Sequence, residues 1–218
     1  MRFYEQGKVP LTPHMYFVYG DGGTGKTTLF KQFPGRKLLI SFDLSTNPLM
    51  GDESIDVAVV ETGDGPKIQE TVMYWINGAI KAGKYQAIAL DNLSALQNLV
   101  LENIDNRAKD NRQNYQKLQL WFRELSMLLR TSGLSVYATA HQVDNGANGL
   151  TDGGRYAADM NEKTFNAFTS TFDLVGRIFL KDGQRWIDLD PEQGNHAKNR
   201  IDDRKLIKAE ELIQQEEH

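Results

Sequence analysis

The chain has 218 residues, enough for one α/β domain with a full core, and its 40% hydrophobic and 25% charged content is typical of globular proteins. A net charge of −4 argues against a generally basic surface for nucleic acid, so any DNA contact must come from local basic patches. Without cysteine there are no disulfides, thiol catalysis or cysteine-held metals, and without a membrane-spanning run or signal peptide we expect a cytoplasmic protein with no membrane partner.

The first half of the chain alternates compact apolar runs with helical patterns. The apolar runs predict strands, at residues 15–19, 37–42, 56–60 and 87–90. The helical patterns predict helices, at residues 26–33, 68–80 and 92–104, the first of them stopped by Pro34-Gly35. Residues 45–54 contain Pro48 and Gly51 and are expected to form a loop. This alternation indicates a mainly parallel sheet flanked by helices.

The second half continues the pattern and ends differently. We expect a polar loop, an amphipathic helix, a strand and a long polar loop, at residues 105–114, 115–129, 134–139 and 143–163. Residues 175–180 and 184–189 flank Asp182-Gly183, which predicts a C-terminal β-hairpin. Residues 1–207 are expected to form one domain, and residues 208–218, with four glutamates, an acidic tail that is a solvated helix.

A phosphate-binding motif follows the first predicted strand. The segment from Gly20 to Thr27 reads G-x-x-x-x-G-K-T, directly between a strand and a helix. Its glycines allow successive backbone N–H groups to point inward at an anion, Lys26 would reach the β- and γ-phosphates, and the Thr27 hydroxyl would ligate Mg²⁺. The predicted nucleotide contacts are Gly20, Asp21, Gly22, Gly23, Thr24, Gly25, Lys26, Thr27 and Thr28.

The acidic half of such a site is expected at the end of another strand. Asp91 ends the run 87–90 and is the predicted second Mg²⁺ residue. The next residue is Asn92, where many ATPases carry a catalytic glutamate, so either the carboxylate that activates water comes from elsewhere or the expected ATPase is slow, or stimulated by DNA. Asp43, at the end of the second strand, is the candidate; the alternative is a turn aspartate that caps the following loop. No Asn-Lys-x-Asp motif for guanine is present, which favours ATP as the nucleotide.

With these motifs in this order, the chain resembles the RecA-like P-loop ATPases, most closely the small phage-encoded ones associated with single-strand annealing and recombination. The resemblance covers roughly residues 16–203 and implies a RecA-like P-loop NTPase core with ATP and Mg²⁺ as cofactors. It also implies that Gln142, or alternatively His141, senses the γ-phosphate after the strand 134–139. Lys198 and Arg200 resemble a Lys-x-Arg element that reaches the γ-phosphate of a neighbouring subunit, which implies a homo-oligomer with ATP at its interfaces.

The same resemblance places single-stranded DNA on two loops. By position these are residues 105–117 and 143–163, of which the first carries a net charge of +2 and the second −2. The predicted DNA contacts are Arg107, Lys109, Arg112, Lys117, Arg155 and Lys163. Solvated surface is the alternative for both loops.

Three functions remain open from the sequence. The first is an ATPase that oligomerises on single-stranded DNA and promotes annealing or strand pairing in phage recombination, with a single-strand-binding protein as a further candidate partner. The second is a helicase or a helicase loader. The third is an ATP-dependent regulatory switch that does not bind DNA, which the acidic charge and the doubtful catalytic carboxylate favour.

Overall fold

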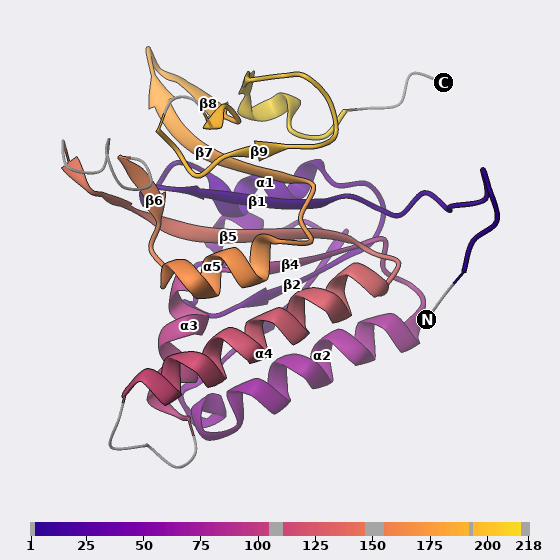
Figure 1. Ribbon diagram of the computed structural model, residues 1–218, viewed down its shortest axis with the longest axis vertical. Coiled ribbons are helices and arrows are strands. Elements are labelled where there is room, and N and C mark those ends of the chain that lie inside the picture. Colours follow the sequence, from indigo (N-terminus) through magenta and orange to yellow (C-terminus); the bar gives the residue numbers. More distant parts are fainter. Residues whose placement is uncertain (1–2, 105–110, 147–154, 192–193, 215–218) are drawn as a thin grey trace.

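The protein is an α/β structure in which helices pack on both faces of a twisted sheet (Figure 1). The computed structural model describes residues 3–104, 111–146, 155–191 and 194–214. In the described residues, no helix is long and apolar enough to cross a membrane.

The sheet has ten strands, and the parallel ones carry the nucleotide motif. Their bounds are β1 Met15–Gly20, β2 Lys37–Ser41, β3 Ile55–Val59, β4 Ala87–Asp91, β5 Ser135–Asp144, β6 Tyr156–Ala158, β7 Leu174–Lys181, β8 Gln184–Asp188, β9 Lys198–Asn199 and β10 Leu206–Lys208. The order along the sheet is β10-β8-β7-β1-β5-β4-β2-β3, with β6 on β5 and β9 on β7. Strands β3, β2, β4, β5, β1 and β7 are parallel, while β8 and β10 extend the sheet in antiparallel fashion. The mainly parallel sheet and the C-terminal hairpin are therefore as predicted.

The sheet separates the hydrophobic core into two layers, and helices cover each of them. The helical segments are α1 Lys26–Leu29, η1 Phe30–Gln32, η2 Asn47–Leu49, η3 Thr62–Lys67, α2 Ile68–Ala82, α3 Leu93–Glu102, α4 Asn111–Thr131, α5 Glu162–Thr169 and η6 Ala209–Glu211. Helices α2 to α5 cover one face, where Val72, Phe122 and Phe168 pack against strand residues such as Phe17. On the other face, α1 and η1 pack with the C-terminal segment over residues such as Val18 and Leu39. Successive side chains along a strand are buried in opposite layers, as a sheet covered on both faces requires.

Several predicted boundaries are wrong in ways that matter for the site. The first helix ends at Leu29 and continues only as the 3₁₀ turn η1. Helix α4 begins at Asn111, so residues 111–114, predicted as loop, are helical; their polar sequence has no apolar period to indicate a helix. Strand β5 continues to Asp144 and pairs with β6, so the expected loop 143–163 contains a hairpin arm and the start of α5.

Residues 208–214, the described part of the predicted tail, do not form a solvated helix. Three apolar residues of the stretch 207–212 are buried in the layer that covers α1: Ile207 on β10, and Ala209 and Leu212 after it. Gln32 donates a hydrogen bond to the carbonyl of Ala209, 2.9 Å away. Residues 207–212 are thus part of the packed structure, because their apolar positions find a partner that a local sequence window does not contain.

Candidate nucleotide site

The phosphate-binding loop lies at the carboxyl end of β1. Strand β5 lies between β1 and β4. Gly20 is the last residue of β1 and Asp91 is the last residue of β4, so the two residues lie on either side of β5. Gly25, at the start of α1, has φ +92°, and Gly23 has φ +75°, a backbone region that strongly favours glycine. These two conformations turn the loop back toward α1, which is the shape of a backbone anion nest.

Lys26 is held over the loop by its own backbone. Its side chain is only 7% exposed, and Nζ donates to the carbonyls of Gly20 and Asp21, both at 2.8 Å. Burial lowers the pKa of Lys26, while the carboxylates of Asp91, Asp21 and Asp43 oppose that shift. The ammonium therefore lies in a mostly desolvated position among acidic groups, and a phosphate could replace the two carbonyls as its partner.

Thr27 and Asp91 form the oxygen pair expected for magnesium. The Thr27 hydroxyl donates to Asp91 Oδ2 at 2.7 Å, and the buried Thr139 hydroxyl donates to Oδ1. Burial raises the pKa of Asp91, and the two hydroxyl donors act against that rise. In the described residues, no three acidic or histidine side chains gather to form a complete metal cage. Two hard oxygens on one side fit Mg²⁺, which keeps waters and phosphate oxygens as its other ligands.

A cavity of about 440 Å³ opens in front of this pair. It is lined by Gly22, Gly23, Gly25, Lys26, Thr27, Thr28, Asp43, Ser45, Asn47, Pro48, Asp91, Asn92, His141 and Arg185. The loop, the magnesium pair and the candidate carboxylate Asp43 thus face one space, although they come from three different strand ends.

Asp43 is joined to Asn92 and His141 in a hydrogen-bonded chain. Asn92 Oδ1 accepts from the N–H of Ala95 at the start of α3, which fixes the amide so that Nδ2 donates to Asp43. The same Nδ2 lies 3.1 Å from His141 Nε2, so this nitrogen accepts and the imidazole proton is on Nδ1. Asn92, which stands where many ATPases have a glutamate, therefore orients two other polar groups of the cavity.

Gln142 points to a different place from the one expected. His141, and not Gln142, is among the described residues that line the cavity. Gln142 Nε2 donates to Asp21 in the phosphate loop at 2.8 Å, and its Oε1 accepts from Arg177 at 2.9 Å. Successive side chains of β5 face opposite sides of the strand, so only one of the two can face the magnesium pair. Of the two γ-phosphate sensors considered, the geometry favours His141.

Lys198 and Arg200 lie toward the other end of the parallel strands. Lys198 on β9 pairs with Val175, whose β1 partner is Phe17, three residues or about 10 Å of strand before Gly20. Lys198 Nζ donates to the carbonyl of Thr169 at 2.7 Å, and burial lowers its pKa to about 8. Lys198 thus has a hydrogen-bond partner within its own chain, and its contact with the γ-phosphate of a neighbouring subunit stays a prediction. The Arg200 side chain is exposed.

The predicted DNA residues fall into separate groups. Arg107 and Lys109 lie outside the described residues. Arg155 forms an ion pair with Asp144 across the β5–β6 hairpin at 3.1 Å. Arg112 and Lys163 line one surface groove with Tyr115, between α4 and the start of α5. Lys117 is on α4, within the helix predicted at residues 115–129. Two cations assigned to different loops thus come together beside an aromatic ring.

Arg185 is the site residue that sequence reasoning missed. It follows the hairpin turn on β8, lines the same cavity of about 440 Å³, and donates from Nε to the carbonyl of Thr24 at 3.0 Å. Arg185 is far from the phosphate loop in the sequence, so no motif spacing predicts that the two meet. Arg185 reaches the loop because β7 pairs with β1 and β8 pairs with β7.

Comparisons with known proteins agree with this fold. A family model described as an AAA domain matches residues 12–201. Among solved structures, a KaiC-like protein from the hyperthermophilic archaeon Pyrococcus horikoshii is similar, with 11% identity and a TM-score of 0.50 over 81% of this chain and 78% of that one. At this identity the likeness concerns the fold, which is that of RecA- and KaiC-like P-loop proteins. The comparison with curated proteins gives no match.

Proposed function

The chain belongs to the AAA domain family of P-loop ATPases, and from this premise we propose that it binds and hydrolyses Mg-ATP to control binding of single-stranded DNA. The observation that carries the ATP half is the contact between Thr27 and Asp91 beside the buried Lys26. These groups supply a cation for the β- and γ-phosphates and hard oxygens for Mg²⁺, which supplies charge neutralisation at the γ-phosphate when bound.

In the proposed hydrolysis, Asp43 orients and deprotonates the attacking water. Its carboxylate faces the same cavity as Lys26 and Asp91, on the wall formed by the end of β2. Asn92 holds one carboxylate oxygen and the N–H of Ser45 donates to the other at 3.1 Å, which fixes the direction of the group. A fixed base in the same cavity as the phosphate-binding groups is what in-line attack on a γ-phosphate needs.

The DNA half of the proposal is supported by the groove between α4 and α5. Arg112 and Lys163 offer two cations for phosphates, and Tyr115, which is 44% exposed, offers a face on which a base can stack. Single-stranded DNA would lie along this groove without sequence readout. An annealing or strand-pairing role, a phage origin and a single-strand-binding protein as partner rest on the sequence resemblance.

Assembly into a homo-oligomer is part of the same proposal. The exposed Arg200 lies away from its own nucleotide site and would act on the γ-phosphate of a second copy, while Lys198 supports the strand that carries it. Arg200→Ala should then keep ATP binding and lose hydrolysis in the assembled protein. Normal hydrolysis by this variant would remove the arginine from the mechanism.

The test of the DNA role is fluorescence anisotropy of a labelled single-stranded oligonucleotide, titrated with and without Mg-ATP across a salt series. We expect ATP-enhanced binding, and we expect a double Arg112→Ala, Lys163→Ala variant to flatten the slope of log K against log salt by about 1.4, since each lost phosphate contact removes about 0.7. Arg123→Ala, an exposed arginine on the same helix, is the matched control.

Absence of DNA binding by a protein that still binds ATP would favour the regulatory switch. The pairing of Arg155 with Asp144 supports that alternative, because it neutralises a cation expected to meet DNA. ATP-dependent directional unwinding of a forked duplex would instead favour the helicase or loader.

A further inference from the structure

We propose that Arg185 is a second phosphate-binding cation of the nucleotide site, and that it holds the α- and β-phosphates of ATP and ADP alike. This inference rests on the proposed ATP binding and deepens it, because it names a residue that governs how tightly the ADP product is retained. Arg185 lies on β8 in the C-terminal hairpin. Like Lys26, it is among the described residues that line the cavity in front of Thr27 and Asp91.

The charges in this cavity leave a place for a further cation. Lys26 brings one positive charge to the lining, whereas Asp43 and Asp91 each bring a carboxylate. A bound triphosphate adds more negative charge than one Mg²⁺ ion cancels, so its oxygens are stabilised by any further cation within reach. The guanidinium of Arg185 supplies that charge, because an arginine side chain stays protonated at every pH at which the protein is folded.

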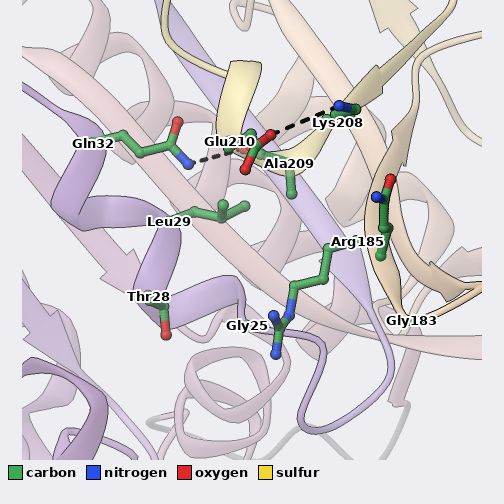
Figure 2. A pocket seen from close by; sticks show the side chains of 10 residues that line it. Gly25, Thr28, Leu29, Gln32, Gly183, Arg185, Lys208, Ala209 and Glu210 are labelled. Atoms are coloured by element: carbon green, nitrogen blue, oxygen red, sulfur yellow. Dashed lines mark hydrogen bonds and ion pairs between the residues drawn. The ribbon is translucent and has the colours of Figure 1, made fainter.

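The guanidinium is held against the phosphate loop by its own Nε. This atom donates to the carbonyl of Thr24 at 3.0 Å. A Cβ on Gly25 would lie 3.0 Å from Nε and 3.7 Å from Cζ of Arg185, so the end of the side chain lies along the glycine backbone. Figure 2 shows Arg185 extending from β8 toward Gly25. The close approach therefore depends on the missing side chain at this position of the loop.

The other end of the guanidinium is available to a ligand. An arginine carries N–H donors on Nε and on both terminal Nη groups, arranged in one plane. The carbonyl of Thr24 occupies the donor on Nε, and neither Nη group of Arg185 has a hydrogen-bond partner among the described residues. The side chain is exposed as well as lining the cavity. A planar fork that is fixed on one side and free on the other is prepared to bind two phosphate oxygens.

The position of Arg185 on the loop indicates which phosphates it contacts. In a motif of this type the backbone N–H groups cradle the α- and β-phosphates, while the lysine reaches the β- and γ-phosphates. Arg185 lies on the backbone of Gly25, so its Nη groups are placed for the two phosphates that ATP and ADP share. A contact made equally to substrate, transition state and product changes nucleotide affinity and leaves the chemical step unchanged.

The test uses glutamine, because its Nε2 corresponds in position to the Nε of arginine. Arg185→Gln keeps a donor for the carbonyl of Thr24 and removes Cζ, both Nη groups and the charge. Isothermal titration calorimetry of the full chain with Mg-ATP and with Mg-ADP should show both Kd values raised by the same factor, about tenfold or more, as for the loss of a charged hydrogen bond. In steady-state hydrolysis, KM for ATP should rise by a similar factor while kcat stays within about twofold.

Two further variants separate charge from support of the loop. Arg185→Lys keeps a positive charge and should bind both nucleotides more tightly than Arg185→Gln does. Lys181→Gln removes a positive charge from the same hairpin, at a residue that is not among the described ones lining the cavity. It should leave both Kd values within about twofold of the wild type, because an exposed charge outside the site is screened by salt.

Each failure has its own signature. Wild-type affinity of Arg185→Gln for both nucleotides would overturn the phosphate contact and leave Arg185 as a support of Thr24. A loss for ATP alone would overturn the assignment to the α- and β-phosphates. An equal loss in Lys181→Gln, or weaker binding by Arg185→Lys than by Arg185→Gln, would contradict a direct contact. If the wild type binds neither nucleotide, or if Lys26→Ala binds both normally, the proposed ATP site itself is wrong.

Discussion

Two glycines of the phosphate loop should respond very differently to the same substitution, alanine. A Cβ on Gly20 would lie 2.4 Å from the carbonyl oxygen of Ile178 and 2.7 Å from its Cγ2. That oxygen belongs to β7, which is paired with β1 at this residue, so neither backbone can move away without straining the sheet. Overpacking of this kind costs about 1–3 kcal/mol, and we expect the upper end because backbone is involved.

The expected result for Gly20→Ala is a fall in Tm of about 6–12 °C, since about 3 kcal/mol acts on a chain of this size. The measurement is thermal unfolding followed by circular dichroism, with urea unfolding to give the free energy directly. Gly22→Ala is the matched control, because its Cβ would meet nothing within 4 Å and its φ is outside the left-handed region. It should shift Tm by less than about 2 °C.

A Tm for Gly20→Ala within about 2 °C of the wild type would refute the reasoning, because it would mean that β1 and β7 separate at little cost. Equal losses in Gly20→Ala and Gly22→Ala would refute it differently. They would show that the loop as a whole, and not the close approach to Ile178, sets the stability.

Two further predictions concern acidic residues. Asp43→Asn should lower ATP hydrolysis about 100-fold or more without weakening Mg-ATP binding, because a general base contributes about 10²–10⁴; phosphate release with calorimetry measures both, and the exposed Asp203→Asn should hydrolyse normally. Hydrogen bonds, above all from Arg36, hold the pKa of Asp56 below its ordinary 3.8. The folded pKa is the lower one, so its stabilisation is complete above about pH 5 and is lost as pH falls. The Tm advantage of wild type over Asp56→Asn should therefore shrink between pH 5 and pH 2, and a constant difference would contradict the ion pair.

The order of elements and the phosphate site were largely predictable from the sequence. Strand runs around residues 15–19 and 87–90 are continuous apolar segments, which parallel strands covered on both faces require. The motif from Gly20 to Thr27 specifies a local backbone shape, so its position between a strand and a helix could be read directly. Asp91 ends its strand as expected and contacts Thr27.

Only the tertiary structure decided what surrounds that site. Asp43 and Asn92 follow the ends of β2 and β4, and His141 lies within β5. Their hydrogen bonds depend on the order β1-β5-β4-β2, which no local pattern encodes. The register of β5 turned His141 to the cavity and Gln142 away from it. Because β7 and β8 pair beside β1, Arg185 reaches the loop. The same packing buries Leu212 and brings the carbonyl of Ala209 to Gln32. Local sequence fixes backbone shape over a few residues, whereas partners distant in the chain are chosen by how the layers pack.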